Sequence, residues 1–334
     1  MNMNTSTLSL YTNSTQSTLS SGYPIRFWSY LFSNIFSLLT GFFDLYYLLS
    51  DASLRQALHN YVIIILLCLG VFYELTDIIW ILYNDHNRRP LIRATVFYEI
   101  WTYINYTFYS IALELFAWAT IERHILIFHQ NWIATKRRCF FFHYFPPIAI
   151  IIYYLIYLAY VHFDPFCVSD FQDFLNGGIH IPCAFYRTVL GLWDIDFHQV
   201  FPTLVIVGCS IGLIIRTIIQ RQKLTHEIQW KKYRKMIVQL LSISVLYITC
   251  NGPWVLVIFA FQFGLSPALT AIALTYTGFL YYYVIFLFPM VCCLSLPELR
   301  KKFREKILFC FKQKSKKTNV ALSTTKGTMA SNTK

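Results

Sequence analysis

The chain has 334 residues, of which 56% are hydrophobic, 19% aromatic and only 13% charged, and its formal net charge is +12. A soluble domain carries about 25% charged residues, so this chain cannot cover a globule with polar surface. Its 9 cysteines are too few for a disulfide scaffold, and the aromatic content argues against disorder over most of the length. A large membrane protein remains.

A helix that crosses a membrane needs about 20 mostly apolar residues. Seven stretches have this length and character, at about 26–50, 58–83, 95–125, 139–161, 197–221, 235–262 and 267–293. Open sheet edges are not tolerated in lipid, and the alternating pattern of a barrel is absent. The sequence therefore predicts an all-α bundle of seven transmembrane helices over residues 26–295, without a cleavable signal peptide before it.

The basic residues predict the orientation of the bundle. With the amino terminus outside, 23 of the 28 Lys and Arg residues fall on the inner side and 5 on the outer side. Inner loops carry the excess of positive charge, so we expect an N-out, C-in arrangement. Residues 1–25 are then a polar extracellular tail, with glycosylation sequons at Asn4 and Asn13.

Short motifs lie within or at the end of four of these stretches: Glu122-Arg123-His124 ends the third, the fifth contains Pro202, the sixth contains Cys250-Asn251-Gly252-Pro253 and the seventh contains Phe288-Pro289. In this arrangement they resemble the acid-Arg-Tyr, Cys-Trp-x-Pro and Asn-Pro-x-x-Tyr motifs of the rhodopsin-like (class A) G-protein-coupled receptors. The approach to the sixth stretch, from residue 230, is similar to that of invertebrate peptide-type receptors of this class.

The resemblance implies a plasma-membrane receptor that binds an extracellular ligand and activates a heterotrimeric G protein. Arg123 would meet the G protein when the inner half of the sixth helix moves outward about Pro253, and His124 and Pro289 would belong to the same switch. The acid that restrains this arginine from the sixth helix in the family is missing here. We therefore expect a weak restraint, held mainly by Glu122, and measurable basal activity.

The chain also departs from the family pattern. The positions that normally hold a sodium ion inside the bundle fall at Phe42, Gly70, Ala112 and Phe288, none of which offers a side-chain oxygen. Cys292 stands where the family has a tyrosine after the proline of the seventh helix. We expect no sodium ion at this place, and no other metal or cofactor.

Two acids mark a candidate ligand pocket. Glu74 and Asp77 are three residues apart in the second stretch and are expected on one helix face. They would meet a cationic group of the ligand, or else bond to Tyr, Thr or Asn side chains of neighbouring helices. By the resemblance, Asn105 stands where amine receptors have an aspartate, Tyr282 where opsins have the retinal-binding lysine, and Asn251 where the sixth helix has a tryptophan.

These positions argue against an amine or retinal and favour a neuropeptide or another small molecule. Acids expected on the outer loops would attract a basic or amidated peptide by long-range steering, or are ordinary solvated surface. They are six in number: Asp85, Asp164, Asp170, Asp173, Asp194 and Asp196.

Two cysteines, Cys167 and Cys183, are expected outside the membrane. Tyr98 stands where the family's usual bridge to the third helix begins, so we expect a Cys167–Cys183 disulfide within one loop, or else two free thiols. Residues 296–311 predict an amphipathic eighth helix on the inner surface of the bilayer, with Cys310 as a palmitoylation candidate. Residues 312–334 are expected to be a disordered cytoplasmic tail that binds arrestin when phosphorylated.

Other functions are weighed by the same features. A receptor that binds its ligand but signals differently or no longer signals remains open, because Asn251 and Phe288 replace residues of the family's switch. A transporter or channel would need paired, interrupted helices in two halves, which are not found. The sequence has no nucleophile–base pair, phosphate loop or metal motif of an enzyme, and we expect no nucleic-acid partner.

Overall fold

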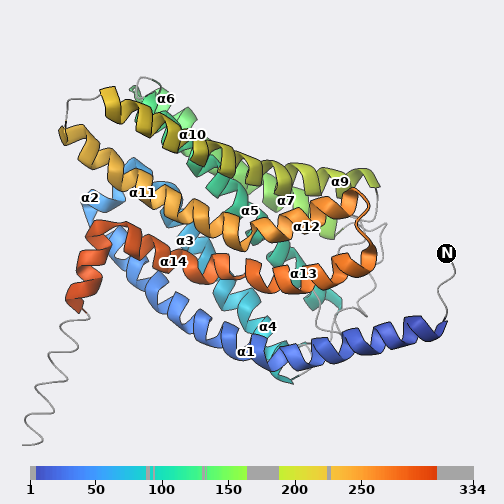
Figure 1. Cartoon of the computed structure of the whole chain (residues 1–334). Helices are drawn as coiled ribbons and strands as arrows, with labels where there is room; N and C mark the ends of the chain where they lie inside the picture. The colour runs from blue at the N-terminus through green and yellow to red at the C-terminus, as the bar shows by residue number, and fades with distance from the viewer. Residues whose placement is uncertain are drawn as a thin grey trace, which may run out of the picture.

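The computed structural model describes residues 5–87, 91–92, 95–129, 132, 134–163, 188–223 and 227–306. Within these residues the chain forms seven long helical segments, here called spans 1 to 7, that pack in one bundle (Figure 1). The all-α, seven-helix fold predicted from the apolar stretches is confirmed.

The spans contain the following elements. Span 1 is α1 (Thr5–Ser50), and span 2 is α3 (Tyr61–Tyr73), η2 (Glu74–Ile78) and α4 (Ile79–Asn87). Span 3 is α5 (Thr95–Phe128), and span 4 is α6 (Lys136–Cys139), η4 (Phe140–Tyr144) and α7 (Phe145–His162). Span 5 is α9 (Thr188–Ile195), η6 (Asp196–Val200) and α10 (Phe201–Lys223). Span 6 is α11 (Glu227–Cys250) and α12 (Gly252–Gln262), and span 7 is α13 (Pro267–Tyr281) and α14 (Tyr283–Ser295). The short α2 (Ala52–Arg55) and η1 (Leu58–Asn60) join spans 1 and 2.

Three spans begin well before the sequence predicts. The backbone of α1 is already helical at Thr5, within the expected tail. Span 5 begins at Thr188 instead of at about 197, and span 6 begins at Glu227 instead of at about 235. In span 5, Asp194 and Asp196 suggested a loop, because a free carboxylate is costly in lipid. Asp194 is instead buried and hydrogen-bonded to His198, so the helix accommodates it.

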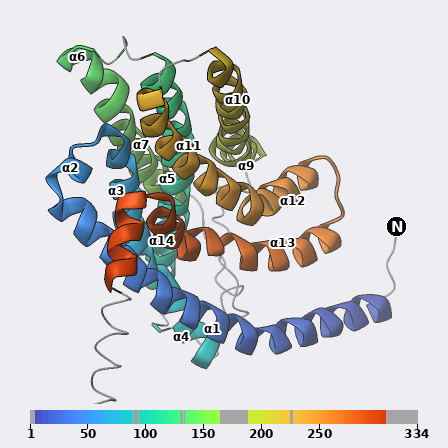
Figure 2. The same ribbon diagram turned by 60° about the vertical axis from the view of Figure 1, so that its left-hand side comes forward.

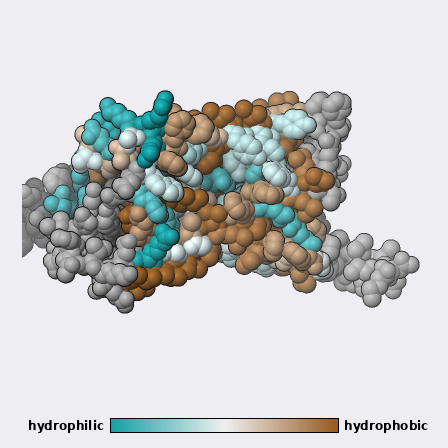
Figure 3. Space-filling view, turned by 90° about the horizontal axis from the view of Figure 1, so that it is seen from above, coloured by the Kyte–Doolittle hydropathy of each residue, from teal (hydrophilic) through white to brown (hydrophobic). Residues whose placement is uncertain are grey.

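The exterior of the bundle is apolar. Five helices in the described part of the chain are long and apolar enough to cross a membrane, or six if the bent pair that forms span 6 counts as one. Large apolar side chains such as Phe32, Ile156 and Leu256 are about two-thirds exposed, and brown surface predominates along the bundle in Figure 3. So much exposed apolar surface is expected of a chain that faces lipid.

Span 3 is the central helix of the bundle. α5 packs against α3, α7, α10 and α11 (Figures 1 and 2). It also carries Glu99, Glu114, Glu122 and Arg123. Charged side chains inside a membrane are tolerated where they face the interior of a bundle, and the central place of α5 provides this shelter.

Local irregularities interrupt five of the spans, one of them span 7, which is broken at Tyr282. Single π-helical turns, η2, η4 and η6, lie within spans 2, 4 and 5. Span 6 bends by 46° between Ile237–Cys250 and Gly252–Gln262. Pro253 follows the break, and a proline there removes one helical hydrogen bond, which accounts for a bend at this point.

The eighth helix packs against the inner end of span 1. Residues 297–306 are helical, and Leu299 is fully buried while the ring of Phe303 packs edge-on against that of Phe43. Lys302 Nζ lies 3.1 Å from Asp51 Oδ2 and 4.7 Å from the centre of the Tyr47 ring. The predicted amphipathic helix is thus present as far as it is described, with its apolar face on the bundle.

Asp51 is expected to hold this helix in place. Hydrogen bonds from Ser53 and Lys302 lower the pKa of Asp51 to about 2. The stabilisation that Asp51 gives to the eighth helix is therefore present while the carboxylate is ionised, and it is lost only as the pH falls towards that value. We expect Asp51→Asn to speed amide hydrogen exchange in 297–306 a few-fold, equally at neutral and mildly acidic pH after correction for intrinsic rates. Glu305→Gln, which removes only a 4.0 Å contact with Lys301 inside the same helix, is the control. Equal acceleration by both variants would contradict the role given to Asp51.

Candidate functional site

The most extensive buried polar group lies between spans 2, 3 and 7. Trp101 Nε1 donates to Asp77 Oδ1 over 2.6 Å, and Asn105 Nδ2 donates to Asp77 Oδ2 over 3.1 Å. The Asn105 amide also donates to the hydroxyls of Tyr73, at 2.7 Å, and Tyr282, at 3.0 Å. All five side chains are buried. We call Tyr73, Asp77, Trp101, Asn105 and Tyr282 the Asp77 cluster.

The Asp77 cluster unites three residues predicted for the ligand pocket, Asp77, Asn105 and Tyr282. The amide has two hydrogens for three acceptors, so at least one of its bonds is shared. The carboxylate is held by donors from the protein itself. The geometry thus matches the expectation that the acid bonds to neighbouring helices, and it ties span 3 to spans 2 and 7.

Glu74 does not share this site, so the expectation of one common helix face is wrong. Its Oε1 accepts a hydrogen bond of 2.6 Å from Ser37 Oγ of span 1. The reason is the π-helical turn η2, which contains both acids and changes the angle between them. Glu74 therefore faces span 1, while Asp77 faces span 3.

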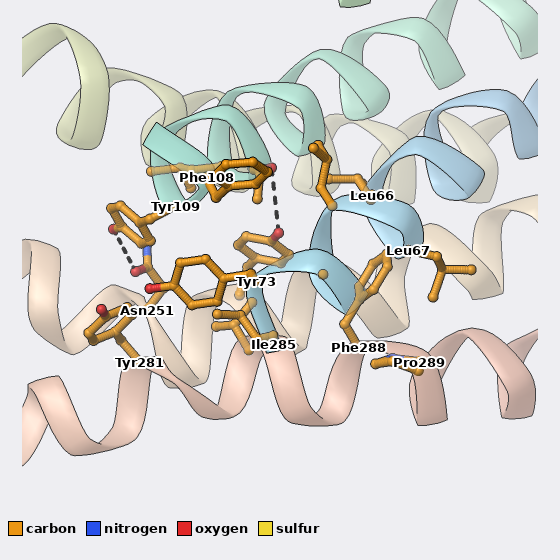
Figure 4. Close-up of a pocket in the computed structure, with 16 residues that line it drawn as sticks. Leu66, Leu67, Tyr73, Phe108, Tyr109, Asn251, Tyr281, Ile285, Phe288 and Pro289 are labelled. Carbon is orange, nitrogen blue, oxygen red and sulfur yellow. Dashed lines mark hydrogen bonds between the residues drawn. The ribbon is translucent and has the colours of Figure 1, made fainter. Parts of the chain in front are cut away.

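A small cavity lies next to the Asp77 cluster, towards the inner half of the bundle. Its volume is about 50 Å³, which is room for a few water molecules. Figure 4 shows Tyr109 and Asn251 at one end and Leu67, Phe288 and Pro289 at the other. The Tyr109 hydroxyl donates to Asn251 Oδ1 over 2.9 Å, which joins span 3 to span 6 at the break of span 6.

The cavity occupies the place expected of the family's sodium site. Gly70, Ala112 and Phe288 line it, as the predicted alignment requires, and no carboxylate is among the described residues of its wall. The donor set does not fit a hard cation.

The structure does not support the alignment of span 1 on Phe42. Phe42 is 53% exposed and faces outward, whereas a Cβ on Gly41 would lie 3.2 Å from Val71 and 3.7 Å from Pro289. Gly41 is therefore the inward position, and its missing side chain lets spans 1 and 7 approach each other.

The three residues of the inner motif point to three different spans. Arg123 is buried and lies near Cys292 of span 7. His124 Nε2 lies 2.7 Å from the backbone oxygen of Cys209 in span 5. Glu122 is buried, and its carboxylate bonds to His143 Nδ1 of span 4. The motif thus lies where spans 3, 4, 5 and 7 meet. The partner of Glu122, His143, does not belong to any of the family's motifs.

Two of the six expected outer-loop acids are buried and paired. Asp85 lies in α4 and forms a two-pronged ion pair with Arg26, whose Nε donates to Oδ2 over 2.7 Å. Asp194 Oδ1 lies 3.0 Å from His198 Nδ1. The expectation that these carboxylates lie on solvated loops is wrong, because each is compensated inside the fold.

Four residues of these sites were not predicted from the sequence: Tyr73, Trp101, Tyr109 and His143. Tyr73 and Trp101 stand four residues before Asp77 and Asn105, a spacing that places each pair on one helix face. Tyr109 likewise stands four residues after Asn105. Helical spacing from the predicted residues would have pointed to all three, whereas His143 depends on how spans 3 and 4 pack.

Other predicted residues lie outside the described part of the chain: Asn4, Cys167, Cys183 and Cys310. Asn13 lies in α1, where only its backbone is described. The glycosylation, disulfide and palmitoylation assignments therefore stay predictions.

Comparison with known proteins identifies the fold. No family model matches the sequence, and none of the curated proteins matches it. The structure, in contrast, has the seven-helix fold of the rhodopsin-like receptors. It resembles the crystal structure of squid rhodopsin with a TM-score of 0.64 and 14% sequence identity, over 87% of each chain. With its apolar spans, the chain is a multi-pass membrane protein of this fold.

Proposed function

We propose that the chain is a rhodopsin-like G-protein-coupled receptor of the plasma membrane. In this proposal the amino terminus is outside, an extracellular ligand binds at the outer ends of the spans, and a heterotrimeric G protein binds at the inner ends, with arrestin as a further partner. The 23-to-5 distribution of basic residues supports this orientation.

The observation that carries the proposal is the position of Arg123. Arg123 is buried at the inner end of the central helix. It therefore does not extend to lipid headgroups or to solvent, as an arginine at the end of a membrane helix often does. It lies beside Cys292 of span 7 and one residue from the buried Glu122. An outward movement of the inner half of span 6 about its 46° bend would open a path to this side chain.

The ligand we propose is a peptide. The Asp77 cluster is satisfied by its own side chains, and the cavity beneath it, of about 50 Å³, is too small for an organic ligand. We propose that the ligand binds nearer the outer ends of the spans. A peptide is the ligand we favour there, because acids of the outer side would attract a basic or amidated peptide, and a small molecule is the alternative.

A second candidate is a receptor that binds its ligand without coupling to a G protein. The observation in its favour is the hydrogen bond between Tyr109 and Asn251. It fixes the side chain of Asn251 at the break of span 6, where the family has a tryptophan. The bond must break, or turn with span 6, for the switch to operate.

The test is nucleotide exchange on a panel of purified heterotrimeric G proteins. Membranes that contain the receptor are expected to raise exchange above that of empty membranes for at least one heterotrimer, because the restraint on Arg123 is weak. Exchange stimulated only by an added peptide would support a silent receptor. Peptide binding with no exchange on any heterotrimer would favour the second candidate.

A further inference from the structure

The carboxylate of Glu122 has a partner on span 4. Its Oε1 bonds to Nδ1 of His143, and the two side chains are 3% and 1% exposed. Among the described residues this imidazole is the one hydrogen-bond partner of the carboxylate. The acid that precedes Arg123 is therefore directed away from span 7, towards span 4.

The fold places His143 by two local features. The hydroxyl of Thr135 caps α6 by accepting from the backbone N–H of Arg138. The π-helical turn η4 then turns His143 inward. The imidazole is also packed between aromatic rings, with centroid distances of 5.3 Å to Tyr61 and 4.4 Å to Tyr144.

We propose that His143 is a positioning residue for the coupling site: it holds the carboxylate of Glu122 towards span 4 and away from Arg123. The inference rests on the proposed function, because the state of Arg123 matters only if Arg123 meets a G protein. The carboxylate accepts a hydrogen bond from His143, and when it is turned towards span 4 it is less available to accept one from Arg123.

The surroundings of the pair leave the carboxylate as the partner of the imidazole. Nδ1 of His143 bonds to Glu122, and its Nε2 is buried without a partner in the described structure. Tyr61 faces the pair from α3, Cys139 and Tyr144 belong to the same span, and Glu122 and Arg123 come from α5. Glu122 is the one acid among these groups, so it is the one carboxylate that the imidazole can bind there.

The test uses basal nucleotide exchange by the full-length receptor in membranes. His143→Phe keeps the packing against Tyr61 and Tyr144 but cannot hold the carboxylate. We expect it to lower exchange about two- to tenfold, the range that one hydrogen bond gives.

Two controls separate positioning from a structural effect. His129→Phe alters another histidine of the inner side, which stacks on Trp132, and is expected to leave basal exchange unchanged. In a Glu122→Gln background, His143→Phe is expected to have no further effect, because His143 acts through the carboxylate. An equal loss in both backgrounds, or unchanged exchange in His143→Phe, would overturn the proposal.

A spectroscopic measurement keeps the inference separate from the proposed function. NMR of histidine-labelled receptor, assigned with His143→Phe, is expected to show a hydrogen-bonded Nδ1–H signal that Glu122→Leu, which has no acceptor, removes. If that signal is absent, or survives Glu122→Leu, the pairing is refuted whether or not any heterotrimer responds. If the signal behaves as expected while no heterotrimer responds to any stimulus, the pairing of His143 with Glu122 stands. The proposed function then fails, and with it the role of His143 at the coupling site.

Discussion

Replacing Arg123 with alanine is expected to reduce receptor-stimulated nucleotide exchange to the level of empty membranes. The guanidinium is buried at the inner end of the central helix, where four spans meet. A charge that is removed from such a desolvated contact costs roughly 2–5 kcal/mol, which corresponds to a loss of about 30-fold or more. Exchange is measured per folded receptor in the membrane.

Two matched variants sharpen this result. Arg123→Lys keeps the charge but loses the planar fork of donors, so partial activity is expected. Arg137→Ala removes an exposed arginine of α6 on the same side of the bundle, and a smaller effect is expected. If Arg123→Ala stimulates exchange as strongly as the wild-type protein, Arg123 is not part of the coupling site. The proposal of a receptor would then rest mainly on the fold.

Asp77→Ala is expected to lower the thermal stability of the protein more than any other single removal of an acid. The indole N–H of Trp101 and the amide of Asn105 would lose their acceptor in the interior. A buried donor without a partner costs about 1–3 kcal/mol, while hydrogen bonds between membrane helices average about 0.6 kcal/mol. We therefore expect a loss of roughly 1–4 kcal/mol in the free energy of unfolding, seen as a lower unfolding midpoint in detergent.

The control for Asp77→Ala is Glu99→Ala. Glu99 is another acid of the bundle, only partly buried, at the start of span 3, and its removal is expected to have little effect. Asp77→Asn retains an oxygen for Trp101 and is expected to lie between the two. If Asp77→Ala unfolds at the same temperature as the wild-type protein, the Asp77 cluster does not hold spans 2, 3 and 7 together.

The fold could be predicted from the sequence because the length and apolar character of the stretches determine it. Seven stretches long enough to cross a bilayer leave few alternatives to a helical bundle, and the prolines of spans 5 to 7 narrowed the family. Asp77 was found as an acid within the second stretch, Asn105 by counting back from Arg123 and Tyr282 by counting back from Pro289. The structure brings these three side chains together. Their role in binding a ligand stays a prediction.

The failures have a common physical origin in tertiary packing. Whether Asp85 and Asp194 are solvated depends on Arg26 and His198, and the pairing of Asp85 joins segments that are far apart in the chain. Glu74 and Asp77 were assigned to one face because a regular helix was assumed. Phe42 was wrongly placed inside the bundle, because a glycine in an apolar helix does not show which of its neighbours faces inward.

The π-helical turns have a consequence for any comparison between this chain and receptors of the same fold. Each such turn inserts one residue into a helix, and one residue corresponds to about 100° of rotation. Beyond η2, η4 and η6, a position matched by counting from an inner landmark then lies on the wrong side of its helix. Ligand-contact positions transferred from a receptor without these turns need a gap inside spans 2, 4 and 5, where alignments rarely open one. A homology-based pocket drawn without such gaps would present a face of the helix that looks towards lipid.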